Sequence, residues 1–291
     1  MRHALVASIL AASLFLPATA AGQQPPQEQP AELVVTGTRQ REQVRNFVDA
    51  LTRAPVFGQL SRFVEAVCPE TIGLSPHQNR AVAERIRSVA EAAAISVGRQ
   101  GCRPNLFVIV AQDREDVIRQ LRANWLDPRG DPVRIPRQSG PAVALHLEGL
   151  LDGDGVPAAV KQEEGDGRSG YYIVAGSGAS SRVRPMSQPH FLLAALVVEP
   201  EALEGLTTLQ LADYAAMRLL ARTDPSRLEN AAAPTILNVL DAPMGTAVPV
   251  TLTQWDLGFL RALYGSGERR YASRQRVEMR QLLRQELERA R

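Results

Sequence analysis

The chain has 291 residues, of which 45% are hydrophobic and 22% charged, and its formal net charge is +2. An apolar fraction of this size permits a substantial core, and the length suits one large domain or two small ones of roughly 100–200 residues each. The near-neutral charge gives no electrostatic basis for nucleic-acid binding. Lys161 is the single lysine, so almost all basic charge is arginine.

The N-terminus has the pattern of a secretory signal peptide over residues 1–20. Arg2 precedes an apolar run over residues 4–16, and Ala18 and Ala20 form a small-x-small cleavage pattern. The run has about thirteen residues, whereas a transmembrane helix needs about 20. No cysteine follows the cleavage site, which argues against a lipid anchor. We therefore expect a periplasmic or secreted protein with no transmembrane segment after cleavage.

Residues 21–32 form a Pro/Gln-rich tract that cannot bury apolar area, so we expect a disordered leader. Residues 33–39, LVVTGTR, resemble the short consensus near the start of the plug of TonB-dependent receptors. Nothing like a 22-stranded barrel follows these seven residues. A chance match or a short strand is the better interpretation of this segment.

Two amphipathic helices are predicted in the first third of the chain. Residues 44–51 carry apolar side chains at helical spacing. The second helix has Ser75 as N-cap, Pro76 at its first position and Gln78 completing a capping box. His77 lies in its first turn and is expected to be solvated.

Four stretches are typical of strands, which alternate with helices and turns: residues 105–111, 142–147, 171–175 and 191–198. Alternation within the second of them places His146 outward. Asp113 is expected to cap a helix that contains Trp125. The order in which the strands pair cannot be read from the sequence.

The least polar helix covers residues 206–221, where Thr207 and Gln210 form a capping box and only Asp213 and Arg218 are charged. Further helices are predicted at residues 252–264 and 274–291. We therefore predict a single α+β domain over residues 33–291, helical from about residue 206. Its small mixed or antiparallel sheet would be packed by several helices.

The two cysteines, Cys68 and Cys102, lie in a compartment that is oxidising if the signal peptide is used. A structural disulfide between them is predicted, closing a loop of about 35 residues. A catalytic or metal-binding pair would require closer spacing or nearby histidines.

Motifs of common enzyme chemistries are missing from the sequence. No H-E-x-x-H motif brings together His77, His146 and His190. The sequence around Ser177 and Ser180 lacks the G-x-S-x-G frame, and no phosphate-binding loop surrounds Lys161. Residues 152–155, DGDG, favour a hairpin turn over a calcium loop, which needs a glutamate at position twelve. We therefore assign no catalytic, cofactor-binding or metal-binding residue and expect no cofactor.

Five long motifs carry a resemblance to known proteins: VCPETIGLSPHQN, GCRPNLFVIV, LTTLQLADYAAMRLLARTDPSRL, PTILNVLDAP and LTQWDLGFLRALY. Together they resemble a group of secreted alphaproteobacterial proteins of unknown function. More distantly, a buried helix followed by a W-D-L-x-F-L-R-x-L-Y helix is similar to zincin-like families. That similarity implies a scaffold without its zinc, because Gln210, Asp213 and Tyr214 stand where an active zincin has its metal ligands.

Two functional hypotheses follow. The first is a non-catalytic scaffold or partner-binding protein of the periplasm or exterior, and the alternative is a degenerate or unusual envelope hydrolase with a zincin-like fold. A possible basic contact surface on the C-terminal arm would suit an acidic envelope partner or an anionic surface; its residues are Arg269, Arg270, Arg274, Arg276, Arg280 and Arg284. The competing interpretation is a solvated amphipathic helix.

Overall fold

The computed structural model describes residues 29–52, 58–124, 140–152, 160–163, 171–174, 185, 187–228, 233–243 and 245–290. The chain divides into two compact units, Met1–Thr38 and Arg39–Arg291. Helix α1 (Gln29–Leu51) includes residues 33–39, so the predicted short strand there is wrong. The predicted signal peptide, most of the leader, Trp125 and the predicted turn beyond Asp152 lie outside the described residues.

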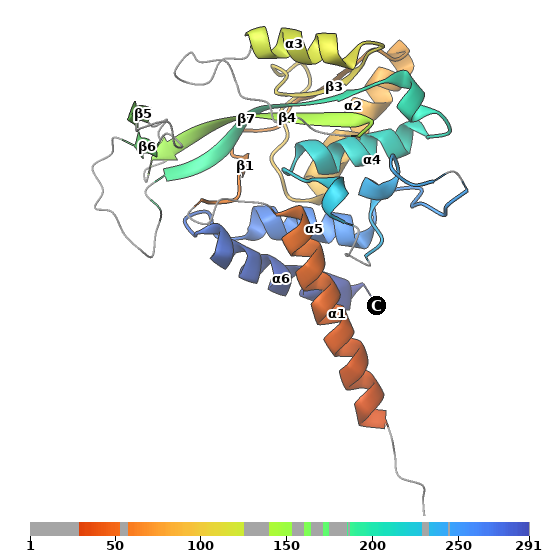
Figure 1. The fold of residues 1–291 in the computed structure, drawn as a ribbon, viewed down its shortest axis with the longest axis vertical. Coiled ribbons are helices and arrows are strands. Elements are labelled where there is room, and N and C mark those ends of the chain that lie inside the picture. The colour runs from red at the N-terminus through yellow and green to blue at the C-terminus, as the bar shows by residue number, and fades with distance from the viewer. Residues whose placement is uncertain are drawn as a thin grey trace, which may run out of the picture. The chain divides into compact units, whose positions relative to one another are not determined.

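A five-stranded sheet organises the unit Arg39–Arg291 (Figure 1). Its central strand is β7 (Ser187–Val198), which pairs in parallel with β3 (Leu106–Val110) and with the short β1 (Arg62–Phe63). On the far side of β3 lies β2 (Pro69–Ile72), also parallel. On the other side of β7, β4 (Ala142–Asp152) runs antiparallel.

The predicted α+β class with a small mixed or antiparallel sheet is therefore wrong: four of the five strands run parallel and lie between helices in an α/β-like fold, and β4 is the one antiparallel strand of this sheet. The order β2, α2 (Pro76–Ala92), β3 is a strand-helix-strand unit whose crossover makes the two strands parallel. Strands β3 and β7 are nearly continuous apolar runs, which is typical of strands covered on both faces. These apolar runs are visible in the sequence. The predicted helical C-terminal half is confirmed.

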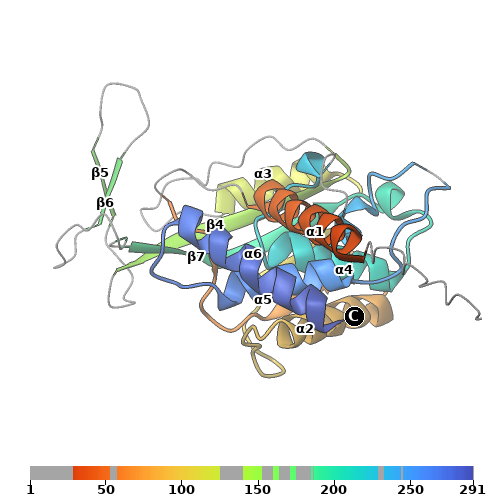
Figure 2. The ribbon, with the colours of Figure 1, turned by 90° about the horizontal axis from the view of Figure 1, so that it is seen from below.

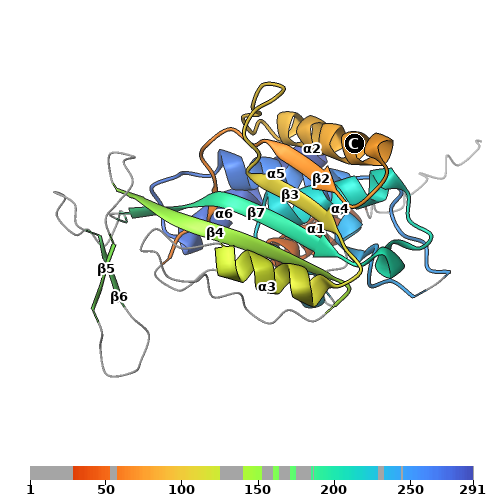
Figure 3. The ribbon, with the colours of Figure 1, turned by 90° about the horizontal axis from the view of Figure 1, so that it is seen from above.

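Helices cover both faces of the sheet. On one face, α3 (Arg114–Asn124) lies across β4 and β7, as Figure 3 shows from above. Its residues Val117, Ile118 and Leu121 pack on Val143, Leu145 and Val197. The other face is covered by α2 and α4 (Thr208–Leu219), and α5 (Gln254–Gly265) packs on them. The last helix, α6 (Ala272–Arg289), lies along α5 and beside the C-terminal part of α1 (Figure 2).

A separate two-stranded sheet and three short 3-10 helices lie outside the five-stranded sheet. The predicted strand at residues 171–175 exists as β6 (Tyr171–Val174), but it pairs with β5 (Val160–Glu163) in a separate two-stranded sheet. Short 3-10 helices, η1 (Pro200–Leu203), η2 (Pro225–Arg227) and η3 (Ile236–Asn238), link the larger elements. Among the described helices, none combines the length and the apolar character needed to cross a membrane.

Candidate functional site

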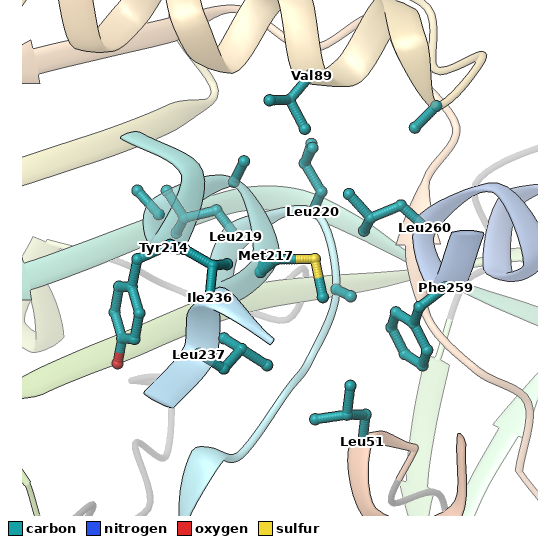
Figure 4. Close-up of a cluster of buried hydrophobic side chains, with 14 of the residues drawn as sticks. Leu51, Val89, Tyr214, Met217, Leu219, Leu220, Ile236, Leu237, Phe259 and Leu260 are labelled. Carbon is teal, nitrogen blue, oxygen red and sulfur yellow. The ribbon is translucent and has the colours of Figure 1, made fainter. Parts of the chain in front are cut away.

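Helix α4 begins as the sequence predicts. The Thr207 side chain accepts from the Gln210 backbone amide, and the Gln210 side chain accepts from the Thr207 amide. Every residue of positions 210–221 is buried. Figure 4 shows Met217, Leu219 and Leu220 pointing into a cluster with Val89 of α2 and Phe259 of α5. The helix is therefore sealed inside the core along most of its length.

Asp213 is fully buried on α4, and its carboxylate is held by four donors. Arg85 of α2 approaches it with two nitrogens, at 2.7 and 3.2 Å. The Thr251 hydroxyl and the Leu252 backbone amide donate to Oδ2 at 2.7 and 2.6 Å. Asp213 therefore ties α2 and the segment before α5 to the buried helix.

Asp256 is a second fully buried carboxylate, at the third position of α5. The Thr235 hydroxyl, the Ile236 amide and both the amide and the hydroxyl of Thr253 donate to its carboxylate. Burial raises the pKa of Asp256, and these hydrogen bonds oppose that rise. The two buried carboxylates thus fasten the chain between α4 and α5 near its middle, at Thr235 and Ile236, and at its end, over residues 251–253.

The residues that stand in the place of zincin ligands have other roles. Gln210 donates to the carbonyl of Pro249 at 3.0 Å, and Asp213 binds Arg85. Tyr214 accepts from Arg218 at 2.6 Å. In the described part of the chain, no group of three or more His, Cys, Asp or Glu side chains is placed to hold a metal ion. Because the sheet is of the α/β kind, the zincin-like fold is not retained.

A cluster of ionisable groups lies on the flank of α4, and we call Tyr214, Arg218, Asp224 and Asp241 the flank cluster. The Arg218 guanidinium carbon lies 5.5 Å from the centre of the Tyr214 ring, and both side chains are buried. Burial raises the pKa of Tyr214. The pKa of Asp241 is raised by burial and by the charge of Asp224, against the opposing charge of Arg218. The cluster thus places two carboxylates near a buried tyrosine–arginine pair.

His146 is where the sequence interpretation fails most clearly. Instead of facing outward, its ring lies 4.4 Å from the Phe191 ring, and Nε2–H donates to the carbonyl of Leu219 at 3.2 Å. Burial and the nearby charge of Arg222 lower its pKa to about 3. The alternation of side chains along residues 142–147 assigns His146 to the correct face of the strand. Helices cover both faces of this sheet, however, so neither face is exposed to solvent.

The other histidines lie in contrasting environments. His77 is exposed at the start of α2, as predicted. His190 is only 5% exposed, and burial lowers its pKa. The ring of His190 lies over Gly149 on the neighbouring strand, where a Cβ atom would come within 2.8 Å of it. The sequence suggests this burial only through the apolar residues that surround His190.

The predicted pairing of the cysteines is confirmed at the level of distance, since the sulfurs of Cys68 and Cys102 lie at disulfide-bonding distance with their Cα atoms 6.0 Å apart. Cys68 is buried at the start of β2, and Cys102 is half-buried on the turn before β3. A third residue, Arg87 of α2, contacts both sulfurs.

The six arginines of the predicted basic surface separate into two groups. Three of them are engaged within the fold: Arg270 pairs with Glu278, Arg276 donates to Thr52, and Arg280 pairs with Asp49. By contrast, Arg269, Arg274 and Arg284 form no ion pair with another described residue. Residue spacing alone could not separate these groups, because Thr52 and Asp49, the partners of Arg276 and Arg280, are more than 220 positions away in sequence.

No family model, no curated protein and no solved structure matches this chain.

Proposed function

We propose that this chain is an exported, non-catalytic protein that binds an acidic protein partner through the outward side of α6. The binding stripe consists of Arg274, Val277, Gln281 and Arg284, with Arg269 just before the helix. The observation that supports this proposal is that three of the six arginines have no acidic partner among the described residues, whereas the other three are engaged within the fold.

The spacing of the stripe follows the helix. Residues 274, 277, 281 and 284 are three or four positions apart and therefore lie along one side of α6. Val277 is 49% exposed between the two arginines, although large apolar side chains on this helix otherwise face α5. An apolar side chain flanked by arginines is typical of the centre of a protein interface.

A protein suits this stripe better than a lipid surface does. Stable attachment to an anionic membrane uses clusters of about four to eight basic residues. Here three arginines remain, spread over a half-exposed helix. A partner with acidic side chains would match them one by one and would cover Val277.

Support for export comes from several features. The signal-peptide pattern at residues 1–20, the cysteines at disulfide-bonding distance and the lack of a membrane-spanning helix among the described ones all agree with a periplasmic or secreted protein.

The binding test uses poly-L-glutamate as a model acidic chain and compares wild type with the triple variant Arg269→Gln, Arg274→Gln and Arg284→Gln. We expect roughly tenfold weaker binding at low salt for the variant, from about 0.5 kcal/mol for each charge. The control replaces the exposed Arg80, Arg99 and Arg103 by glutamine, which should leave the affinity unchanged. Equal losses of affinity in both triple variants would show that binding depends only on net charge. Wild-type protein that sediments with phosphatidylglycerol vesicles but does not bind polyglutamate would contradict an acidic protein partner and indicate a lipid surface.

The second candidate function is an envelope hydrolase, and one observation favours it. In the flank cluster, burial and the charge of Asp224 raise the pKa of Asp241, and a carboxyl group with a raised pKa is suited to act as a general acid. On that hypothesis the wild type hydrolyses p-nitrophenyl esters or glycosides, and Asp241→Asn abolishes the activity while Glu201→Gln retains it. Wild type inert toward both substrate classes would leave the partner-binding function alone.

A further inference from the structure

Arg87 is bound in place beside the disulfide. Its Nη1 donates to the carbonyl of Gly98 at 2.6 Å, and Nη2 lies 3.3 Å from Cys102 Sγ and 3.9 Å from Cys68 Sγ. Gly98 leaves room for this arrangement, because a Cβ atom there would come within 2.8 Å of the Cys102 sulfur. A fixed positive charge therefore faces both sulfur atoms.

We propose that Cys68–Cys102 is a reactive disulfide, which exchanges with dithiols through Cys102, the less buried of the two residues. A disulfide opens when a thiolate attacks one sulfur and the other leaves as a thiolate. A guanidinium within hydrogen-bonding distance stabilises the departing thiolate and so favours this step. This activity is separate from partner binding, since α6 contributes nothing to it.

The exchange takes place in two steps. A thiolate of the incoming dithiol attacks Sγ of Cys102, the half-buried residue, and the electron pair of the S–S bond moves to Sγ of Cys68, the buried residue. The second thiol of the dithiol loses its proton and attacks its own sulfur in the mixed disulfide, which releases Cys102 as a thiolate beside Arg87. The dithiol becomes a disulfide, the protein gains two electrons, and the two protons of the dithiol pass to the cysteine sulfurs or to water.

The surrounding backbone is held independently of the sulfur atoms. The Cys68 amide donates to Asn105 Oδ1 at 2.7 Å, and the Cys68 carbonyl accepts from the Leu106 amide at 3.3 Å. Val67 exchanges hydrogen bonds with both ends of the turn at residues 96–98. Opening the disulfide therefore leaves β2, β3 and the turn in place, and the reduced protein can be oxidised again.

The test measures reduction of the folded protein by dithiothreitol at neutral pH, followed by mass spectrometry of alkylated thiols. Arg87→Gln should slow reduction about threefold or more, because the charge beside the leaving sulfur is lost. Arg87→Lys should recover part of the rate. The control Arg103→Gln changes an exposed arginine next to Cys102 and should react like wild type.

Two results would overturn the proposal. The first is an Arg87→Gln variant that is reduced at the wild-type rate. The second uses wild type alone and therefore applies even if Arg87→Gln does not fold. It is a slower reduction of the native protein than of the protein unfolded in urea, which would mean that burial protects the disulfide more than Arg87 activates it. Circular dichroism of reduced wild type should retain the native spectrum, and its loss would contradict the reversible exchange.

Discussion

Helix α4 carries Asp213 and Arg218 inside the protein, whereas α6 carries five arginines along a half-exposed helix. On α4, Asp213 has a cation, a hydroxyl and an amide as partners, and Arg218 has the Tyr214 hydroxyl. On α6, two arginines that are two positions apart differ, since Arg276 donates to Thr52 just beyond α1 and Arg274 does not. The role of a charged residue is therefore decided by what lies across from it.

Arginine has a recurring task in this fold. Arg62 donates to the carbonyls of Leu263 and Ser266 at the end of α5, and Arg261 donates to Ala92 at the end of α2. Arg276 does the same for Thr52, just beyond the end of α1. The last carbonyls of a helix have no partners within the helix and carry partial negative charge. A forked guanidinium can satisfy more than one of them, which an ammonium group does less well.

The largest expected effect concerns α4. Replacing Asp213 by alanine leaves Arg85, the Thr251 hydroxyl and the Leu252 amide without their shared acceptor. We expect a loss of about 3 kcal/mol in the free energy of unfolding, the lower end for a broken buried ion pair, because Arg85 can reach water. Urea denaturation at neutral pH measures the loss. Glu84→Ala on the exposed side of α2 is the control and should change stability little. A loss below about 1 kcal/mol for Asp213→Ala would contradict the structural role of Asp213 on α4.

A smaller effect should appear as pH dependence, through the contact of His146 with α4. The folded pKa of about 3 lies below the usual 6.5, so the unfolded chain binds a proton that the folded chain excludes. This contribution to stability is complete above pH 6.5 and declines as the pH falls toward 3. His146→Gln keeps a donor for Leu219 and should lessen the loss between pH 7 and 4.5 by about 2 kcal/mol. Parallel wild-type and variant curves would show that His146 titrates normally.

The sequence predicts local structure well where a residue and its partner are close along the chain. The capping boxes at Ser75 and Thr207 are found as expected. Sheet topology, the orientation of His146 and the separation of the arginines depend on partners far away in sequence. The contacts of His146 with Leu219 and of Arg276 with Thr52 span 73 and 224 positions. No local pattern contains such information.

The flank cluster was missed for the same reason. Tyr214 and Arg218 are one helical turn apart and can be paired from the sequence. Asp224 and Asp241 join them only because the segments η2 and η3 fold back beside α4. A signal did exist, since a charged residue in the middle of an apolar helix such as Arg218 needs a buried partner.

The smallest expected effect separates two arginines of the same helix. Arg276→Gln removes the guanidinium that donates to the carbonyl and hydroxyl of Thr52 at 3.1 and 3.0 Å, and should cost about 1 kcal/mol in the free energy of unfolding. Arg274→Gln, two positions earlier and without these contacts, should change stability by less than about 0.5 kcal/mol. Both changes remove one positive charge from α6, so net charge cancels in the comparison. Urea denaturation of the two variants side by side measures the difference in their free energies of unfolding. This difference should persist in high salt, because the hydrogen bond from Arg276 to Thr52 is partly buried. Equal stabilities would mean that the arginines of α6 are interchangeable and that the arm is a solvated helix throughout.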